Sequence, residues 1–124
     1  MKIVGKSLLA AALTVAVSLT AQAEGDAAKG AKVFRKCKAC HTFDDKRKIG
    51  PTLSGVIGRK AGAVEGFRYS KAFKGLDLVW DEANLSAFLK APKKFVKGTK
   101  MAFPGLRKPQ EITDLLAYMA ENGQ

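Results

Sequence analysis

The pentapeptide Cys37-Lys38-Ala39-Cys40-His41 contains both cysteines and the single histidine of a chain of 124 residues. Two cysteines separated by two residues, with a histidine directly after the second, form the attachment motif of c-type haem. In this motif the thiols add to the vinyl groups of the porphyrin, and the imidazole binds the iron. The spacing therefore predicts one haem c, attached through Cys37 and Cys40, with His41 as an iron ligand.

Three other uses of paired cysteines fit the remaining sequence less well. A structural zinc site needs four ligands, and the chain has no further cysteine or histidine. A thioredoxin-like redox pair belongs at the turn of a βαβ unit, and no part of the sequence alternates as a parallel sheet would. A structural disulfide across two residues would be strained. Haem attachment is the interpretation on which the following steps depend.

The amino-terminal part of the chain has the pattern of a secretory signal peptide. After two lysines comes an apolar run (Leu8–Leu19), and Ala21-Gln22-Ala23 forms a small-residue cleavage site. We expect residues 1–23 to be removed and residues 24–124 to form an exported, periplasmic domain. The alternative is an uncleaved membrane anchor, although the run is shorter than the ~20 residues that span a bilayer. Export agrees with haem attachment.

The charge of the chain limits its partners. With 22 basic and 11 acidic residues, the formal net charge is +11. A basic protein of this kind could hold phosphates, but no nucleic-acid recognition motif accompanies the charge, and export would keep the protein away from DNA. We therefore expect acidic protein partners and no nucleic acid. The segment that remains after cleavage is long enough for one small domain only.

Apolar residues recur at helical spacing in four parts of the sequence, and capping residues mark their ends. We expect a helix from Asp26 to the cysteine motif, a helical turn at Ser70–Lys74, a helix from Asp81 to before Pro92, and a last helix from Pro109 to Gly123. Gly30 lies on the apolar face of the first helix. Because glycine costs about 1 kcal/mol of helix propensity relative to alanine, another helix is expected to cross closely there.

The rest of the sequence reads as ordered loop. The stretch between His41 and Trp80 is rich in glycine and has little periodicity, and Val96–Leu106 also lacks a helical pattern. A small domain could hardly order so many loop residues unless a large apolar ligand gave them a surface to pack against. Haem would supply that surface.

A second axial ligand to the iron must be methionine, lysine or absent, because the single histidine is already used. Met1 leaves with the signal peptide, and Met119 lies on the apolar face of the last helix, where a core role is expected. Met101 lies in an irregular loop that is free to aim a thioether at a metal. Met101 is the best candidate, and an iron without this ligand would instead suit a haem enzyme or a gas or peroxide sensor.

Several short motifs occur together between Glu24 and Gln124: Cys37–His41, Gly50–Gly55, Gly58–Lys60, Gly66–Ser70, Trp80, Pro92–Phe95 and Gly98–Met101. In this combination the chain resembles the class I c-type cytochromes, in the branch of cytochrome c2 and mitochondrial cytochrome c. The resemblance implies an all-α single domain, with about four to five helices wrapped round one haem. It also implies that the first and last helices cross, with Gly30 and Phe34 against Leu115 and Tyr118.

The resemblance also implies a role for individual residues. Cys37 and Cys40 would anchor the haem, His41 and Met101 would ligate the iron, the Pro51 carbonyl would orient the imidazole, Arg59, Tyr69 and Trp80 would hydrogen-bond a haem propionate, and Thr99 would join that network. A buried propionate needs such donors to offset its desolvation. The sequence departs from the family in a shorter His41–Gly50 loop. It also has Phe88 where a tyrosine is usual near the methionine sulfur, and Phe73 where a buried asparagine is common.

An iron with two strong protein ligands favours electron transfer over oxygen chemistry, so we expect a monomeric electron carrier and not an enzyme. The family implies a cytochrome bc complex as donor, and a photosynthetic reaction centre or terminal oxidase as acceptor. Basic residues around the haem edge would steer docking, and the candidates are Lys36, Lys38, Lys93, Lys94, Lys97, Lys100 and Lys108. A third reading is an electron-donating subunit held to a membrane complex by an uncleaved anchor.

Overall fold

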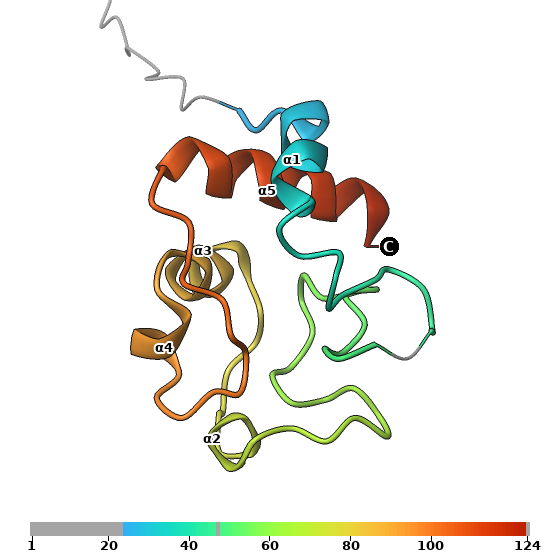
Figure 1. Ribbon diagram of the computed structural model, residues 1–124, viewed down its shortest axis with the longest axis vertical. Helices are drawn as coiled ribbons and strands as arrows, with labels where there is room; N and C mark the ends of the chain where they lie inside the picture. Colours follow the sequence, from blue (N-terminus) through green and yellow to red (C-terminus); the bar gives the residue numbers. More distant parts are fainter. Residues whose placement is uncertain (1–23, 47, 124) are drawn as a thin grey trace, which may run out of the picture.

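The computed structural model describes residues 24–46 and 48–123. The helices in this part of the chain are α1 (Ala27–Phe34), α2 (Lys71–Lys74), α3 (Glu82–Lys90), α4 (Pro92–Phe95) and α5 (Pro109–Asn122) (Figure 1). Within the same residues, β-structure amounts to an isolated antiparallel bridge between Lys60 and Val79. The expected all-α fold is confirmed. The expected signal peptide lies outside the described residues.

Helix α1 delivers the cysteine motif to the interior. The Asp26 side chain caps it by accepting a hydrogen bond from Lys29 N at 3.1 Å, and the helix ends at Phe34. The chain then continues in turns, in which Cys40 N and His41 N both donate to the Cys37 carbonyl, at 3.0 and 2.9 Å. The motif therefore lies on a tight turn just beyond the helix, and not on the helix itself.

Helices α1 and α5 cross at one end of the molecule (Figure 1). A Cβ atom on Gly30 would overlap the Asp114 carbonyl and would lie 2.7 Å from Tyr118 Cβ, so glycine is what permits this close approach. The rings of Phe34 and Tyr118 are in contact, with centroids 5.4 Å apart. Asp26 N donates to Asp114 Oδ1 at 2.9 Å. The expected crossing is confirmed, with Asp114 as an additional polar link.

The shorter helices follow local signals. Ser70 caps α2, and Asp81 caps α3 by accepting from Asn84 N at 2.7 Å. Helix α3 ends before Pro92 as expected, but the same proline then opens α4, which the sequence interpretation missed. Proline at a first helical position has no N–H to leave unpaired, so it starts a helix as readily as it ends one.

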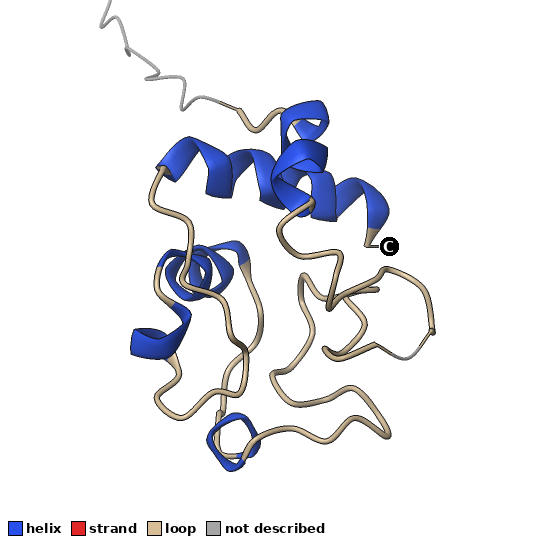
Figure 2. Ribbon diagram, viewed as in Figure 1, coloured by secondary structure: helices blue, strands red, loops and turns tan. Residues whose placement is uncertain are grey.

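Loops form the side of the molecule across from α3 and α4 in this view (Figure 2). Gly58, at φ 88°, turns this region so that its N–H donates to the Trp80 carbonyl at 2.8 Å, and Trp80 N donates to the Arg59 carbonyl at 2.8 Å. These bonds fasten the loops to the segment that precedes α3. None of the helices in the described ranges is long and apolar enough to cross a bilayer.

Candidate functional site

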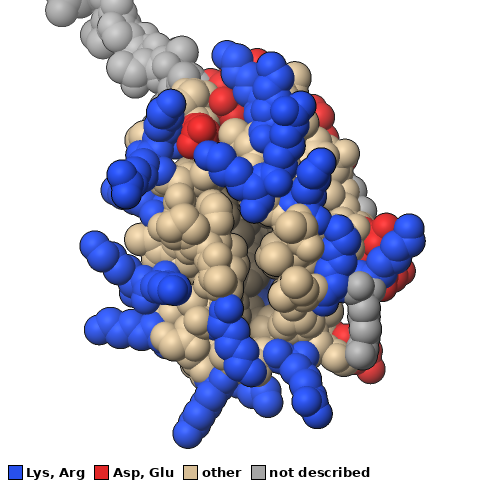
Figure 3. Space-filling model, in the orientation of Figure 1, with Lys and Arg blue, Asp and Glu red and all other residues tan. Residues whose placement is uncertain are grey.

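A cavity of about 400 Å³ opens between the helices and the loops. Figure 3 shows this face hollowed near its centre. The walls are mainly apolar, and they include Leu53, Val56, Phe88, Leu89, Leu115 and Met119. Four groups that could bind a metal or a porphyrin line the same cavity: the side chains of Cys37, Cys40, His41 and Met101. The structure thus brings together the residues that the sequence singled out.

The two thiols are free and half-buried on the turn after α1. Burial raises the pKa of the Cys37 thiol, the neighbouring Lys36 charge opposes this, and Cys40 adds to the rise. Both cysteines share the cavity wall with His41. The turn therefore presents two sulfur atoms and one imidazole to a single ligand.

The His41 ring is held at its Nδ1 by a backbone carbonyl. Its Nδ1 lies 2.8 Å from the Pro51 carbonyl, and because a carbonyl only accepts, Nδ1 carries the proton and Nε2 is free to bind a metal. Burial lowers the pKa of the imidazole, the bond to Pro51 opposes this, and the charges of Arg59 and Lys48 lower the pKa further. The lowered pKa favours the neutral imidazole, which is the form that binds iron.

Gly50 is a site residue that the sequence interpretation did not single out. A Cβ atom at this position would lie 2.5 Å from His41 Cε1 and 2.9 Å from Nε2. Such a contact would displace the imidazole, because real Cβ atoms do not approach so closely. The glycine before Pro51 was a usable signal, since the chain must pass directly beside the ring to bring the carbonyl to Nδ1.

Met101 approaches from the loop after α4. Its N–H donates to Thr99 Oγ1 at 3.2 Å, and Thr99 N donates to the Val96 carbonyl at 3.1 Å, so the loop is turned by its own polar groups. Met119 also lines the cavity, from α5, and is 4% exposed. Two thioethers therefore face the same space, one on a loop and one on a packed helix.

The residues expected at the propionates also line the cavity: Arg59, Tyr69, Trp80 and Thr99. The Arg59 guanidinium donates to the carbonyls of Ser54 at 2.8 Å and Thr52 at 2.9 Å. Its pKa is lowered by burial, and Tyr69 opposes this. The Tyr69 hydroxyl accepts from Val64 N at 3.0 Å and keeps its own proton to donate. Their contacts with a propionate stay predictions.

An aromatic cluster forms part of the wall of the cavity that Met101 also lines. Phe73 and Phe88 meet edge to face with centroids 5.9 Å apart, and Trp80 lies 5.1 Å from Phe88. Phe95 packs behind them, 6.1 Å from Phe88. The two positions at which the sequence departs from the family are thus in contact, and together they make this wall apolar.

Basic side chains surround the hollow in Figure 3, and acidic ones lie nearer the edge of the face. Of the expected docking residues, Lys36 and Lys100 line the cavity. Lys93 and Lys94 lie in α4, Lys97 follows it, and Lys108 precedes α5. Lys36 is engaged by Glu111, at 3.7 Å. Lys48, which the sequence interpretation omitted, donates to the carbonyl of Lys38, within the cysteine motif.

The residues present fit a haem group. Two thiols, an imidazole with a protonated Nδ1, a thioether, apolar walls and polar donors all line one cavity. Gly50 has no side chain, and this leaves room for the imidazole of His41, which a larger residue at position 50 would displace.

Comparison with known proteins gives the class. A family model described as cytochrome c matches residues 27–122, so the chain belongs to the cytochrome c family, among the class I c-type cytochromes. Cytochrome c2 of Rhodomicrobium vannielii is 44% identical over 127 residues, covering 100% of both chains. Cytochrome c-554 of Methylosinus trichosporium is 45% identical over 94% of this chain and 92% of its own. The structure of cytochrome cH from Methylobacterium extorquens matches with a TM-score of 0.75 and 50% identity, over 78% of this chain and 99% of that one.

Membership in this family decides the cofactor. Members bind haem c covalently, and Cys37 and Cys40 have the spacing that attachment requires. The chain therefore binds one haem c through these two thiols. It is an electron carrier that exchanges electrons with partner proteins.

Proposed function

We propose that the protein is a soluble periplasmic carrier of single electrons, with His41 and Met101 as the axial ligands of its haem iron. One observation carries this proposal: the imidazole of His41, the thioether of Met101 and both thiols line the same cavity. When bound, the haem supplies an iron that changes its oxidation state by one electron. The protein supplies the ligands, the apolar walls and the access route.

Each residue of the site has a defined task in this proposal. Pro51 fixes the ring of His41 and makes it a more basic ligand, as hydrogen-bonded partners of metal-bound histidines do. The aromatic cluster around Phe88 excludes water from the side of Met101. Arg59, Tyr69, Trp80 and Thr99 hold the propionates. If His41 and Met101 both ligate the iron, they would leave no coordination site for a substrate, so we propose a carrier and not an enzyme.

The proposed partners follow from charge and family. Exchange must be fast and reversible, and a basic face raises the association rate more than the affinity. We propose that Lys36, Lys38, Lys93, Lys94, Lys97, Lys100 and Lys108 steer a monomeric carrier to acidic surfaces. The donor would be a cytochrome bc complex, and the acceptor a photosynthetic reaction centre or terminal oxidase. Residues 1–23 would act as the signal peptide, and residues 24–124 as the cytochrome domain.

The ligand assignment is tested by replacing each thioether that lines the cavity. Met101→Ala should abolish the far-red charge-transfer band of the oxidised protein and open the iron to cyanide. Met119→Leu, which conserves volume, is the matched control and should keep both the band and the resistance to cyanide. The assignment is wrong if Met101→Ala behaves as the parent does. A parent protein that is high-spin and binds peroxide would instead support a haem enzyme or sensor.

A further inference from the structure

Residues 48–52, called here the returning segment, lie beside the cysteine motif and are joined to it at a constant spacing in sequence. Several hydrogen bonds join residues that are ten apart in sequence. They are Lys48 Nζ to the Lys38 carbonyl at 2.6 Å, Gly50 N to the Cys40 carbonyl at 2.8 Å, the His41 ring to the Pro51 carbonyl at 2.8 Å, and Thr52 Oγ1 to the Thr42 carbonyl at 3.4 Å. The register thus decides which carbonyl reaches the His41 ring.

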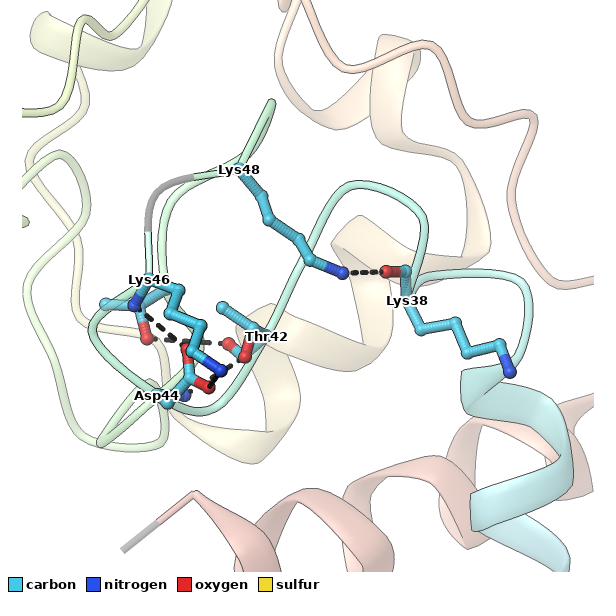
Figure 4. Close-up of polar contacts among 6 residues, drawn as sticks. Lys38, Thr42, Asp44, Lys46 and Lys48 are labelled. Carbon is cyan, nitrogen blue, oxygen red and sulfur yellow. Dashed lines mark hydrogen bonds and ion pairs between the residues drawn. The ribbon is translucent and has the colours of Figure 1, made fainter.

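The first of these bonds is made by a side chain. Figure 4 shows the Lys48 chain extending across the loop to the carbonyl of Lys38. This carbonyl belongs to the residue directly after Cys37, between the two cysteines. A hydrogen bond from an ammonium group is shorter and stronger than one between neutral groups. Lys48 therefore fastens the start of the returning segment to the motif.

The other polar contacts drawn in Figure 4 remain within the tip of the loop. Asp44 N donates to Thr42 Oγ1 at 3.2 Å, and Lys46 N donates to Asp44 Oδ1 at 2.9 Å. The Lys46 ammonium also lies 3.8 Å from Asp44 Oδ2. These bonds shape the turn, but they do not connect it to the cysteine motif. Lys46 is thus a natural control for Lys48.

The returning segment has little freedom next to the imidazole. Gly50 passes so close to the ring that even a Cβ atom has no room, and the next residue supplies the carbonyl for Nδ1. A slip of this segment would therefore move the carbonyl away from the ring. Lys48, two residues before Gly50, is bound to the Lys38 carbonyl and therefore restrains that movement.

We propose that Lys48 is a positioning residue for His41, because its bond to the Lys38 carbonyl holds the register that keeps the Pro51 carbonyl on Nδ1. The inference rests on the proposed role of His41 as an iron ligand. The reduction potential alone does not report this positioning role, because two effects of losing Lys48 act in opposite directions. Loss of a positive charge favours the oxidised state, whereas a weaker Nδ1 bond makes the ligand less basic and favours the reduced state.

The test measures hydrogen exchange in the reduced protein with haem attached, by NMR. In Lys48→Met, the ring Nδ1–H of His41 and the N–H of Gly50 should exchange about threefold to tenfold faster, as expected for loss of one hydrogen bond at an exposed site. The N–H of Trp80, which donates to Arg59, is the internal reference and should be unchanged. Lys48→Arg should restore slow exchange, and Lys46→Met should match the parent.

The inference is overturned if the His41 proton exchanges at the parental rate in Lys48→Met, or if Trp80 loosens as much as His41, since that would mean general destabilisation. Should Lys48→Met not retain haem, Lys48→Gln keeps a shorter neutral donor and must give an intermediate exchange rate. If His41 does not ligate the iron, the result is distinguishable: the His41 ring protons of the parent protein would then lack the large NMR chemical shifts that iron ligation produces.

Discussion

Single residues set the polarity around the proposed iron ligands. Phe73 and Phe88 occupy positions where the resemblance led us to expect polar residues, and they pack against each other and Trp80. Phe88 is 6% exposed, and neither phenylalanine carries a hydrogen-bond donor. The His41 ring, by contrast, has a polar partner, because the Pro51 carbonyl lies at its Nδ1. If His41 and Met101 ligate the iron as proposed, the two ligands would be tuned by different means.

Phe88→Tyr should raise the reduction potential. A hydroxyl that donates to the Met101 sulfur would draw electron density from it and disfavour the oxidised iron. A difference of about 0.5–1 kcal/mol between the two redox states corresponds to roughly 20–45 mV. Stability should fall by ~1 kcal/mol if the hydroxyl finds no partner. Potential and denaturation midpoint are measured on the same variant.

Phe95→Tyr is the matched control, because Phe95 belongs to the same aromatic cluster but does not line the cavity. It should leave the potential unchanged. A potential that stays constant or falls in Phe88→Tyr, while the sulfur band persists, would show that this hydrogen bond does not tune the iron.

At the level of elements, the crossing of α1 and α5 supports the site. Gly30 lets the helices approach, and the crossing holds the end of α1 from which the cysteine turn emerges. Its polar link is Asp114, which is 4% exposed and accepts from Asp26 N at 2.9 Å and Gln110 Nε2 at 2.8 Å. These two hydrogen bonds lower the pKa of the Asp114 carboxyl, that from Asp26 N most, with Lys29 contributing.

This carboxylate makes the crossing sensitive to acid. Because the pKa is lower in the folded state than in the unfolded chain, Asp114 stabilises the fold above the ordinary carboxyl pKa of about 3.9. That contribution is lost as the pH falls below this value. Asp114→Asn should therefore be less stable than the parent at neutral pH, and the difference should shrink in acid. Urea unfolding between about pH 7 and pH 2 measures the effect.

The control for this experiment is Asp77→Asn, since Asp77 forms an exposed ion pair with Lys60 and such pairs contribute little. Its stability should follow that of the parent across the same pH range. If Asp114→Asn and the parent differ by the same amount at every pH, the link does not depend on the carboxylate charge.

At the scale of the whole molecule, the haem completes the core. Most of the residues between His41 and Trp80 are loop, and the apolar residues that face the cavity would otherwise line about 400 Å³ of unfilled space. At about 24 cal/mol per Å³, a closed, empty cavity of that size would cost about 10 kcal/mol. Because this cavity opens to solvent, that figure is an upper limit, and it is of the same order as the stability of a typical domain.

The chain without haem should therefore be largely disordered. A ligand that binds only the native state adds its binding energy to folding, and the double variant Cys37→Ala, Cys40→Ala removes covalent attachment. Circular dichroism of this variant, produced without haem, should show little helix and no cooperative melt. A cooperative transition with the helical signal of the parent would mean that the protein alone makes a sufficient core.

Charge acts on the molecule as a whole. Electron transfer with a purified cytochrome bc complex should slow as salt rises, because the Debye length shortens from about 30 Å at 0.01 M to about 10 Å at 0.1 M. Lys93→Glu with Lys100→Glu should slow it further at low salt. Lys60→Glu, outside the cavity-lining residues, makes half of that charge change and should slow transfer by less than half as much. Rates indifferent to salt and to the paired change would exclude steering by this face.

Local signals in the sequence were sufficient for the cofactor and most helices. The cysteine motif needs five adjacent residues, and the caps Asp26, Ser70 and Asp81 act on N–H groups three residues away. Such signals are readable because the interacting groups are neighbours in the chain. Helix α4 was missed because Pro92 is compatible with both the end of one helix and the start of the next.

The contacts that complete the site depend on how distant segments meet. Asp26 and Asp114 are 88 positions apart, and the Lys48 ammonium reaches a carbonyl ten residues back. A lysine in a basic sequence has no local feature that distinguishes a hydrogen bond to the backbone from a solvated charge. Packing around the cavity brings Lys48 to the motif, Gly50 to the imidazole and both thioethers to one cavity. These contacts form in the tertiary structure because together they reduce unfilled volume and leave few polar groups unpaired.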